Sequence, residues 1–284
     1  MKVMVTGAGG MLGRDVVRLA EQAGHEVVQL THDELDITDA TAVGDAVLGE
    51  QPEALVNCGA WTDVDGAEGE LESATFVNGT GAAHIALATD RIDCKVVYPS
   101  SDYVFDGTKN SAYVESDETN PLSAYGKSKL AGERETALVN PRHFIVRASW
   151  LFGVNGKNFV DTMMGLGREL DEVVVVADQI GCPTYTGHLA EGIVRLIEWD
   201  DYGCYHMAGA GECSWFEFAV EIFAQTGIDC RVMSTTTEEL GRPAPRPPYS
   251  VLVSEREPSI YLPDWREGLA AFLAERAETE AAPR

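Results

Sequence analysis

The hydrophobic residues fall into short apolar runs that alternate with longer mixed stretches. The apolar runs predict strands at 2–6, 25–30, 54–60, 95–101 and 143–153. The intervening segments predict helices up to residue 24 and at 40–51, 74–90 and 125–139. Strands that alternate with helices of this length are typical of βαβ units and a parallel sheet. Because the strands lack polar alternation, both faces of that sheet are expected to be covered.

The alternation becomes less regular after about residue 150. Residues 173–199 still suggest strand, loop and helix, whereas the proline-rich segment 241–250 breaks regular structure and the tail 276–284 is expected to fray. We therefore predict an α/β chain with a Rossmann-type, doubly wound parallel sheet in residues 1–150. A smaller C-terminal domain covers 151–284, with about 175–210 returning to the sheet.

Charge is the unusual feature of the composition. The 284 residues include 46 acidic and 21 basic side chains, which gives a net charge of −25. The acids are distributed along the chain, and this pattern favours adaptation to high salt, where screening weakens self-repulsion. An ordinary acidic cytosolic protein is the alternative. Either interpretation disfavours nucleic acid as a partner, because phosphate binding needs a basic face.

Membrane and secretory signals are absent from the sequence. No run of eighteen apolar residues is present, and the first residues lead directly into a strand, so we expect neither a membrane span nor a signal peptide. The six cysteines lack a CxxC spacing and are expected to be free thiols in a reducing cytoplasm. We expect no metal site.

Three glycines follow the first strand at the spacing GxxGxxG: Gly7, Gly10 and Gly13. A turn of this kind at the start of a helix lets backbone N–H groups face a pyrophosphate. Glycine is needed there because a Cβ would block the approach or strain the turn. The position indicates dinucleotide binding, with a simple packing turn as the alternative.

A second motif lies at the start of the helix predicted at 125–139. Tyr125 and Lys129 are four residues apart, so they share one face of a helix. A nearby ammonium favours phenolate, and we expect Lys129 to lower the pKa of Tyr125 so that the phenol becomes a general acid. The pair alone could be a surface coincidence.

A longer series of motifs carries a family resemblance. In chain order these are NCGAWTDVDGAE (57–68), SSDYVFDGT (100–108), NPLSAYGKSKLAGE (120–133), RASWLFG (147–153), NFVDTM (158–163), DQIGCPT (178–184), YHMAGAGECSWFEFA (205–219) and LPDWREGL (262–269). Together with GxxGxxG they resemble the dTDP-4-dehydrorhamnose reductases of the extended short-chain dehydrogenase/reductase family across nearly the whole chain.

The resemblance implies NAD(P)H-dependent reduction of the C4 ketone of a nucleotide sugar, dTDP-4-dehydro-L-rhamnose or a close relative. Tyr125 would donate the proton, Lys129 would assist it and hold the nicotinamide ribose, and Ser101 would hydrogen-bond the carbonyl oxygen. Ser100 is the alternative to Ser101. The competing hypotheses are another nucleotide-sugar reductase or epimerase, and a non-catalytic NADP-binding regulatory subunit.

The resemblance also implies the cofactor contacts. They are Gly7, Gly10, Met11, Leu12, Gly13, Asp36, Ile37, Cys58, Gly59, Ala60, Tyr125 and Lys129. Asp36 and Ile37 could instead cap the following helix, and Cys58 is expected to be a packed small residue rather than a nucleophile. Thr31 and His32 occupy the end of the second strand, where an acid would favour NAD. Their presence favours NADPH, with NADH as the alternative.

Substrate contacts follow from the resemblance as well. They are Thr62, Val64, Ser101, Asp102, Trp150, Asn158, Gln179 and Arg246. Trp150 offers an apolar face to a deoxysugar, and Arg246 a guanidinium to the diphosphate. A core tryptophan and a solvated loop arginine are the respective alternatives. The acid-rich segment 61–73 leaves the nucleobase open, and a homodimer remains an option on which the sequence is silent.

Overall fold

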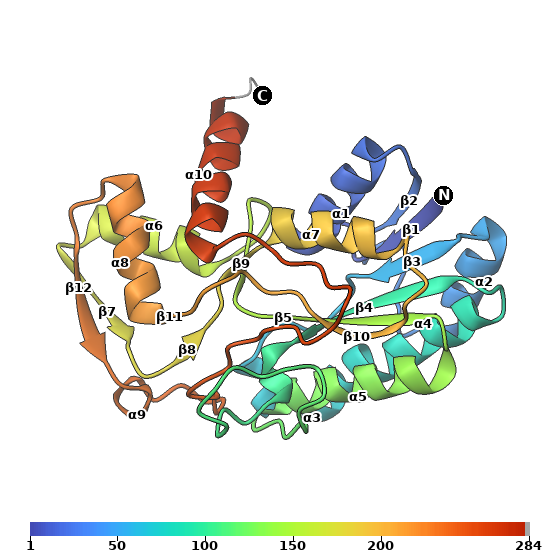
Figure 1. The fold of residues 1–284 in the computed structure, drawn as a ribbon, viewed down its shortest axis with the longest axis horizontal. Coiled ribbons are helices and arrows are strands. Elements are labelled where there is room, and N and C mark those ends of the chain that lie inside the picture. The colour runs from blue at the N-terminus through green and yellow to red at the C-terminus, as the bar shows by residue number, and fades with distance from the viewer. Residues whose placement is uncertain (282–284) are drawn as a thin grey trace.

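The computed structural model describes residues 1–281 and has a parallel six-stranded sheet at its centre (Figure 1). In spatial order its strands are β10 (Gly203–His206), β5 (His143–Ala148), β4 (Lys95–Ser101), β3 (Ala54–Asn57), β1 (Lys2–Thr6) and β2 (Glu26–Leu30). Every neighbouring pair runs parallel. The predicted α/β fold class with a Rossmann-type sheet is confirmed.

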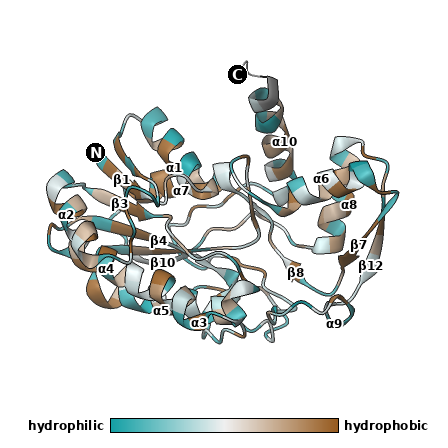
Figure 2. Cartoon of the chain, turned by 180° about the vertical axis from the view of Figure 1, so that it is seen from behind, coloured by the Kyte–Doolittle hydropathy of each residue, from teal (hydrophilic) through white to brown (hydrophobic). Residues whose placement is uncertain are grey.

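Helices cover both faces of this sheet. One face carries α1 (Met11–Gln22) and α7 (Thr186–Leu196), and the other carries α2 (Ala40–Glu50), α4 (Gly81–Asp90) and α5 (Ala124–Val139) (Figure 1). Alternate residues of β1 point to opposite faces of the sheet. Val3 and Val5 pack against α1 and α7, while Met4 packs against α2 and α4. Figure 2 shows hydrophobic residues along the central strands and a mixture of both kinds along α1.

The order of the strands creates a crevice at one edge of the sheet. β1 pairs with β2 on one side and with β3 on the other, so the chain leaves β1 and β3 in diverging directions. Open α/β sheets bind ligands at this kind of switch point, beyond the carboxyl ends of the strands. Gly7, Cys58 and Ser101 come at the ends of β1, β3 and β4 and therefore lie at this edge.

The remaining elements build a second cluster beside the sheet. β7 (Glu172–Val176) pairs in parallel with β12 (Arg231–Thr235), and α6 (Phe159–Glu169), α8 (Trp215–Thr226) and α10 (Trp265–Ala281) surround an aromatic core. Short pieces complete the fold: α3 (Leu71–Thr75), β6 (Leu151–Phe152), β8 (Ile180–Gly181), β9 (Thr184–Tyr185), β11 (Cys213–Ser214) and α9 (Thr237–Leu240). Between the two parts of this cluster, the chain returns to the central sheet as β10, beside β5.

Four predicted elements have clearly different bounds in the structure. The strand predicted at 54–60 ends at Asn57. The helix predicted at 74–90 starts earlier, with α3, and contains a π-helical turn at Phe76–Thr80 before α4. The strand predicted at 143–153 is interrupted because Trp150 has a φ of +49°. The tail predicted to fray is helical as far as Ala281, whereas its last residues, 282–284, lie outside the described part of the chain. No helix among residues 1–281 is long and apolar enough to cross a membrane.

Candidate active site

The glycine turn after β1 is shaped by close backbone contacts. Gly7 has a φ of +63°, and a Cβ built on it would lie 2.5 Å from the backbone nitrogen of Gly59. A Cβ on Gly13 would lie 2.3 Å from the carbonyl oxygen of Gly7. Gly10 is the N-cap of α1 and contributes no side-chain acceptor, so the first N–H groups of the helix remain available. This cradle fits the pyrophosphate of a dinucleotide.

The other predicted cofactor residues line the same crevice. Ile37 is buried, and its side chain lies 3.2 Å from the position of a Cβ on Gly59. Asp36 is exposed and accepts hydrogen bonds from the backbone and hydroxyl of Thr38, whereas Asp39 caps α2. The helix-cap interpretation of Asp36 is therefore wrong, because Asp39 caps α2 and the Asp36 carboxylate shapes its own loop.

The half-buried thiol of Cys58 follows β3 directly. Removal from solvent raises its pKa to about 12, although the positive charge of Lys129 opposes this. The thiolate is the nucleophilic form of cysteine, so Cys58 remains a neutral thiol at physiological pH. Ala60 beside it is exposed, and the chain then turns into the loop of Trp61. The geometry of Cys58 fits a packing role against a cofactor.

Tyr125 and Lys129 are placed by the first turns of α5. Ser123 caps this helix, because its Oγ accepts a 3.0 Å hydrogen bond from the backbone of Gly126. Tyr125 follows in the first turn, half-buried, with the ring of Tyr103 packed edge-on at 5.7 Å between centroids. Ser101 lies beside the Tyr125 phenol and lowers its pKa through a hydrogen bond. Ser101 and Tyr125 therefore come together where β4 ends and α5 begins, and Lys129 lies one turn further along α5.

The expected effect of Lys129 on Tyr125 is wrong. Burial raises the pKa of Tyr125 well above its usual range, and the charge of Asp102 raises it further. The Lys129 ammonium is directed elsewhere: it donates a 2.7 Å hydrogen bond to the carbonyl of Pro99 and lies 4.3 Å from the centroid of the Tyr98 ring. Tyr125 is consequently a fully protonated phenol at neutral pH, which is the form required of a proton donor.

Lys129 is itself shifted by its surroundings. It is 4 % exposed, and burial lowers its pKa to about 8, while Glu133 and Cys58 act in the opposite direction. A buried ammonium in a low-dielectric site is costly unless a counter-charge is near. The state of Lys129 therefore depends on the carboxylate of Glu133, which the sequence analysis did not single out.

The two serines at the end of β4 face different partners. Ser101 donates to Oδ1 of Asp102 at 2.9 Å, whereas Ser100 donates to Oε1 of Glu133 at 2.5 Å. Successive residues of a strand point to opposite faces, which separates the two hydroxyls. Only Ser101 contributes to the pKa of Tyr125. The geometry therefore favours Ser101 over Ser100 as the hydroxyl that serves a ketone beside Tyr125.

Asp102 connects this site to the C-terminal part of the chain. It is 1 % exposed, and its Oδ2 accepts a 2.6 Å hydrogen bond from Ser250. Burial raises its pKa to about 6, although the hydrogen bonds from Ser250 and Ser101 lower it. Asp102 was predicted to contact substrate. In the structure its carboxylate holds Ser101 and Ser250.

Trp150 lies in an aromatic stack. Its ring is parallel to that of Trp215, with 3.7 Å between centroids and 8° between planes. A Cβ on Gly181 would lie 2.5 Å from the Trp150 ring, so glycine is required for this packing. One side of the ring is thus used within the fold, and the residue is only half-buried. The packing interpretation and the substrate interpretation are compatible for this residue.

Asn158 and Gln179 have structural partners. Asn158 caps α6, since its Oδ1 accepts a 2.9 Å hydrogen bond from the backbone of Asp161, and its amide donates to the carbonyl of Gly153. The Gln179 amide donates at 2.9 Å to the hydroxyl of Thr237. Both side chains are nearly buried. They shape the loops around the second cluster, and this role was not visible in the sequence.

Arg246 is paired with an acid. Its Nη2 lies 3.0 Å from Oδ1 of Asp65, and Asp65 also pairs with Arg242 at 3.1 Å. The loop from Arg242 to Arg246 is thereby attached to the loop that follows β3, where Thr62 is exposed and Val64 is half-buried. Two arginines thus share the carboxylate of Asp65.

Asn78 is a further site-forming residue that the sequence analysis missed. It lies in the π-helical turn before α4, and its amide donates to the carbonyl of Trp61 at 3.1 Å and to the hydroxyl of Ser128 at 2.8 Å. Such π-turns are frequent at functional sites. Asn78 fixes the loop after β3 against α5. No spacing rule links position 78 to position 61, so the sequence offered no signal for it.

The comparisons with known proteins agree with this geometry. Residues 1–278 match the family model described as RmlD substrate binding domain. The chain belongs to this family. It is 44 % identical over 278 residues to the spore coat polysaccharide biosynthesis protein SpsK of Bacillus subtilis, covering 97 % of this chain and 98 % of the relative. It is 42 % identical to a dTDP-4-dehydrorhamnose reductase of Streptomyces griseus, covering 95 % and 91 %.

A solved structure gives the same result for the fold. The dTDP-4-dehydrorhamnose reductase of Bacillus anthracis in complex with NADP superimposes with a TM-score of 0.94 at 40 % sequence identity. The match covers 96 % of this chain and 99 % of the other. The predicted family is thereby confirmed over nearly the full length of both proteins.

Proposed function

We propose that this protein reduces the C4 ketone of dTDP-4-dehydro-L-rhamnose to give dTDP-L-rhamnose, using NADPH, with NADH as a second cofactor. The observation that carries the proposal is the contact of Ser101 with Tyr125 at the carboxyl edge of a parallel sheet that also carries the glycine turn, with Lys129 one turn further along α5. A chain that only bound a cofactor would have no chemical need for all three. The RmlD family membership supports the substrate class.

The cofactor, when bound, supplies a hydride to the ketone carbon. The glycine turn and the free N–H groups of α1 bind its pyrophosphate, while Ile37 and Cys58 line the crevice. Asp36, Gly59 and Ala60 complete the proposed binding set. Arg14 supports NADPH, because its Nε donates to the carbonyl of Gly9 at 3.0 Å, next to Thr31 at the end of β2. A guanidinium at this position suits a 2′-phosphate.

The proton comes from the protein. Tyr125 transfers its phenolic proton to the carbonyl oxygen as that oxygen gains negative charge, and the ketone becomes a hydroxyl. Ser101 donates to Asp102 in the structure. On substrate binding its hydroxyl rotates to donate to the same oxygen and stabilises the charge. The ammonium of Lys129, one turn further along α5, holds the nicotinamide ribose. A general acid of this kind contributes about 10²–10⁴-fold to rate.

The proposed substrate residues take different parts in binding. Trp150 offers the exposed part of its ring to the deoxysugar, and Arg246 with Arg242 attracts the diphosphate. Thr62 and Val64 border the site from the loop after β3, and Asp102 acts through Ser101. The remaining two residues, Asn158 and Gln179, shape the surrounding loops. The proposed division is a cofactor domain at 1–150 and a substrate domain at 151–284, from which about 175–210 returns to the sheet. Substrate contacts come from both.

A panel of nucleotide sugars tests the proposal. NADPH oxidation is followed by absorbance with dTDP-4-dehydro-L-rhamnose, its uridine counterpart and other 4-keto-6-deoxysugar nucleotides. The proposal requires the highest kcat/KM with dTDP-4-dehydro-L-rhamnose. Preference for another nucleotide sugar would support the alternative reductase or epimerase, and NADP binding without turnover would support the regulatory subunit.

Location, salt dependence and assembly are further parts of the proposal. All six cysteines are free thiols, which suits a cytoplasmic protein. The net charge of −25 suits high ionic strength, so activity should rise with salt before it falls. A homodimer is proposed as the assembly, and light scattering at two salt concentrations measures it.

A further inference from the structure

Tyr125, Lys129 and Glu133 are spaced four residues apart and share one face of α5. Tyr125 and Lys129 take part in the proposed reaction, whereas Glu133 does not contact the reacting groups in it. Glu133 is 5 % exposed on the helix face that packs against the sheet. A buried carboxylate is costly unless it is paired and hydrogen-bonded, so its retention beside a buried ammonium requires an explanation.

Glu133 accepts three short hydrogen bonds from two residues. Its Oε1 accepts from the Ser100 hydroxyl at 2.5 Å and from Nε of Arg147 at 2.9 Å, and its Oε2 accepts from Nη2 of Arg147 at 2.7 Å. Such a bidentate pair fixes geometry as well as charge. Ser100 belongs to β4 and Arg147 to β5, so Glu133 attaches α5 to both strands.

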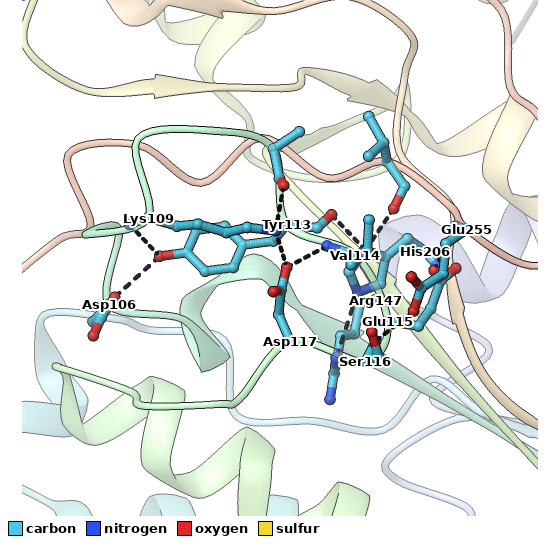
Figure 3. A network of polar contacts seen from close by, with 12 residues as sticks. Asp106, Lys109, Tyr113, Val114, Glu115, Ser116, Asp117, Arg147, His206 and Glu255 are labelled. Carbon is cyan, nitrogen blue, oxygen red and sulfur yellow. Dashed lines mark hydrogen bonds and ion pairs between the residues drawn. The ribbon is translucent and has the colours of Figure 1, made fainter.

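Arg147 is fixed in turn from its other side. Its Nη1 lies 3.4 Å from Nε2 of His206, whose Nδ1 lies 3.1 Å from the carbonyl of Tyr113. Glu115 accepts a 2.8 Å hydrogen bond from the backbone of His206. Figure 3 shows this network reaching from Arg147 through His206 to the loop of Tyr113 and Glu115. The ion pair is therefore rigid at both ends.

Glu133 also bears on the charge of Lys129. The groups that face the Lys129 ammonium are the Tyr98 ring and the Pro99 carbonyl of β4, the Cys58 thiol beyond β3, and Glu133 on its own helix. Of these, only Glu133 is a carboxylate, and it is ion-paired with Arg147. The groups that face Glu133 are Ser100, Arg147, the Lys129 ammonium, the Tyr98 phenol and the Cys204 thiol of β10.

We propose that Glu133 is a positioning residue for the reduction: bonded to Ser100 and Arg147, it holds α5 in register with β4 and supplies the counter-charge that keeps Lys129 an ammonium. The inference rests on the proposed function for its meaning in catalysis. Its effect on Lys129 can be measured without a sugar substrate, because Lys129 also holds the cofactor in the proposed function.

The direction of the effect follows from the charges. Burial already lowers the pKa of Lys129 to about 8, and Glu133 opposes that fall. Removal of the Glu133 charge therefore lowers the pKa of Lys129 further. The ammonium, which is the active form, is then lost at a lower pH. The pH above which kcat and the affinity for NADPH decline should therefore be lower, closer to pH 7.

The test compares Glu133→Gln with Glu135→Gln, which makes the same charge change at an exposed position of the same helix. For Glu133→Gln we expect kcat within about threefold of wild type at pH 6.5 and about five- to tenfold lower than wild type at pH 8.5, since one pKa unit is tenfold in protonation ratio. The affinity for NADPH should weaken in the same direction. Glu135→Gln should follow the wild-type profile.

A double variant keeps the proposal testable if Glu133→Gln fails to fold because Arg147 is left unpaired. Glu133→Gln/Arg147→Met removes both charges and leaves no buried ion alone. It should show a smaller shift of the alkaline limb in the same downward direction, because the carboxylate that opposes the fall in the Lys129 pKa is gone while a nearby positive charge is removed with it. A loss of activity equal at every pH, or an unmoved NADPH profile, would overturn the inference. Wild-type protein that binds NADPH but reduces no 4-keto sugar would instead overturn the proposed function.

Discussion

Ser101 donates a 2.9 Å hydrogen bond to the carboxylate of Asp102, which is buried behind it and also bonded to Ser250. This contact fixes the hydroxyl beside Tyr125 and links the end of β4 to the C-terminal loop. Asp102 thereby couples the organisation of the catalytic edge to the part of the chain that is proposed to hold the substrate. Its energetic cost can be measured.

Replacement of Asp102 by Asn should remove a pH-dependent loss of stability. The pKa of Asp102 is about 6 in the folded protein and ordinary in the unfolded chain, so between about pH 4 and 6 the folded state binds more protons. Its contribution to stability therefore falls as the pH rises through this window, by about 3 kcal/mol for a shift of two units. Urea unfolding at pH 4, 5 and 6.5 measures it. An identical pH slope in wild type and Asp102→Asn would contradict the assignment.

Alanine substitutions of Ser101 and Ser100 should affect catalysis and stability differently. Ser101→Ala should lower kcat by about 10²–10³-fold, as expected for a donor to a developing oxyanion. Ser100→Ala should keep most of the activity at neutral pH and lose about 1 kcal/mol of stability, because it removes a hydrogen bond to the buried Glu133. Steady-state kinetics and thermal unfolding measure the two effects. The reverse pattern would make Ser100 the hydroxyl that serves the ketone.

The glycine cradle is tested by a matched pair of alanine substitutions. Gly13→Ala places a methyl group 2.3 Å from the carbonyl of Gly7 and should abolish NADPH binding. Gly44→Ala in α2 meets no atom within 4 Å and should stabilise the protein by about 0.5–1 kcal/mol, with unchanged binding. Fluorescence titration with NADPH and a thermal melt distinguish them. Retained affinity in Gly13→Ala would place the pyrophosphate elsewhere.

Arg14 should decide between the two cofactors. It lies beside Gly9 and Thr31 at the end of β2, where the adenosine ribose is expected, so Arg14→Gln should raise the KM for NADPH about tenfold. The KM for NADH should change less than about twofold, because NADH lacks the 2′-phosphate that Arg14 would bind. Equal effects on both cofactors would show that Arg14 acts on the turn itself and not on the phosphate.

Much of this architecture followed from local patterns. The parallel sheet could be predicted because apolar runs such as 95–101 need cover on both faces. The glycine turn could be predicted from its spacing after the first strand, and the structure leaves no room for a Cβ on Gly7 or Gly13. The i, i+4 spacing correctly placed Tyr125 and Lys129 on one helix face. These features depend on residues that are neighbours in sequence or on a short repeat.

What failed depended on contacts between distant segments. The spacing of Tyr125 and Lys129 said nothing of burial, which raises the pKa of Tyr125, or of Pro99, which takes the ammonium. The cap formed by Asn158 and the stack of Trp150 on Trp215 arise where separate loops meet. The C-terminal helix persists to Ala281 because its first turns pack into the aromatic core, which a polar tail sequence does not reveal.

The most direct test of the central claim is NADPH oxidation by dTDP-4-dehydro-L-rhamnose with wild-type protein and with Tyr125→Phe. The phenylalanine keeps the ring and removes the proton, so kcat should fall by about 10²–10⁴-fold while the Kd for NADPH changes less than about threefold. Turnover by Tyr125→Phe within tenfold of wild type, or no reduction of this substrate by the wild-type protein, would contradict the account.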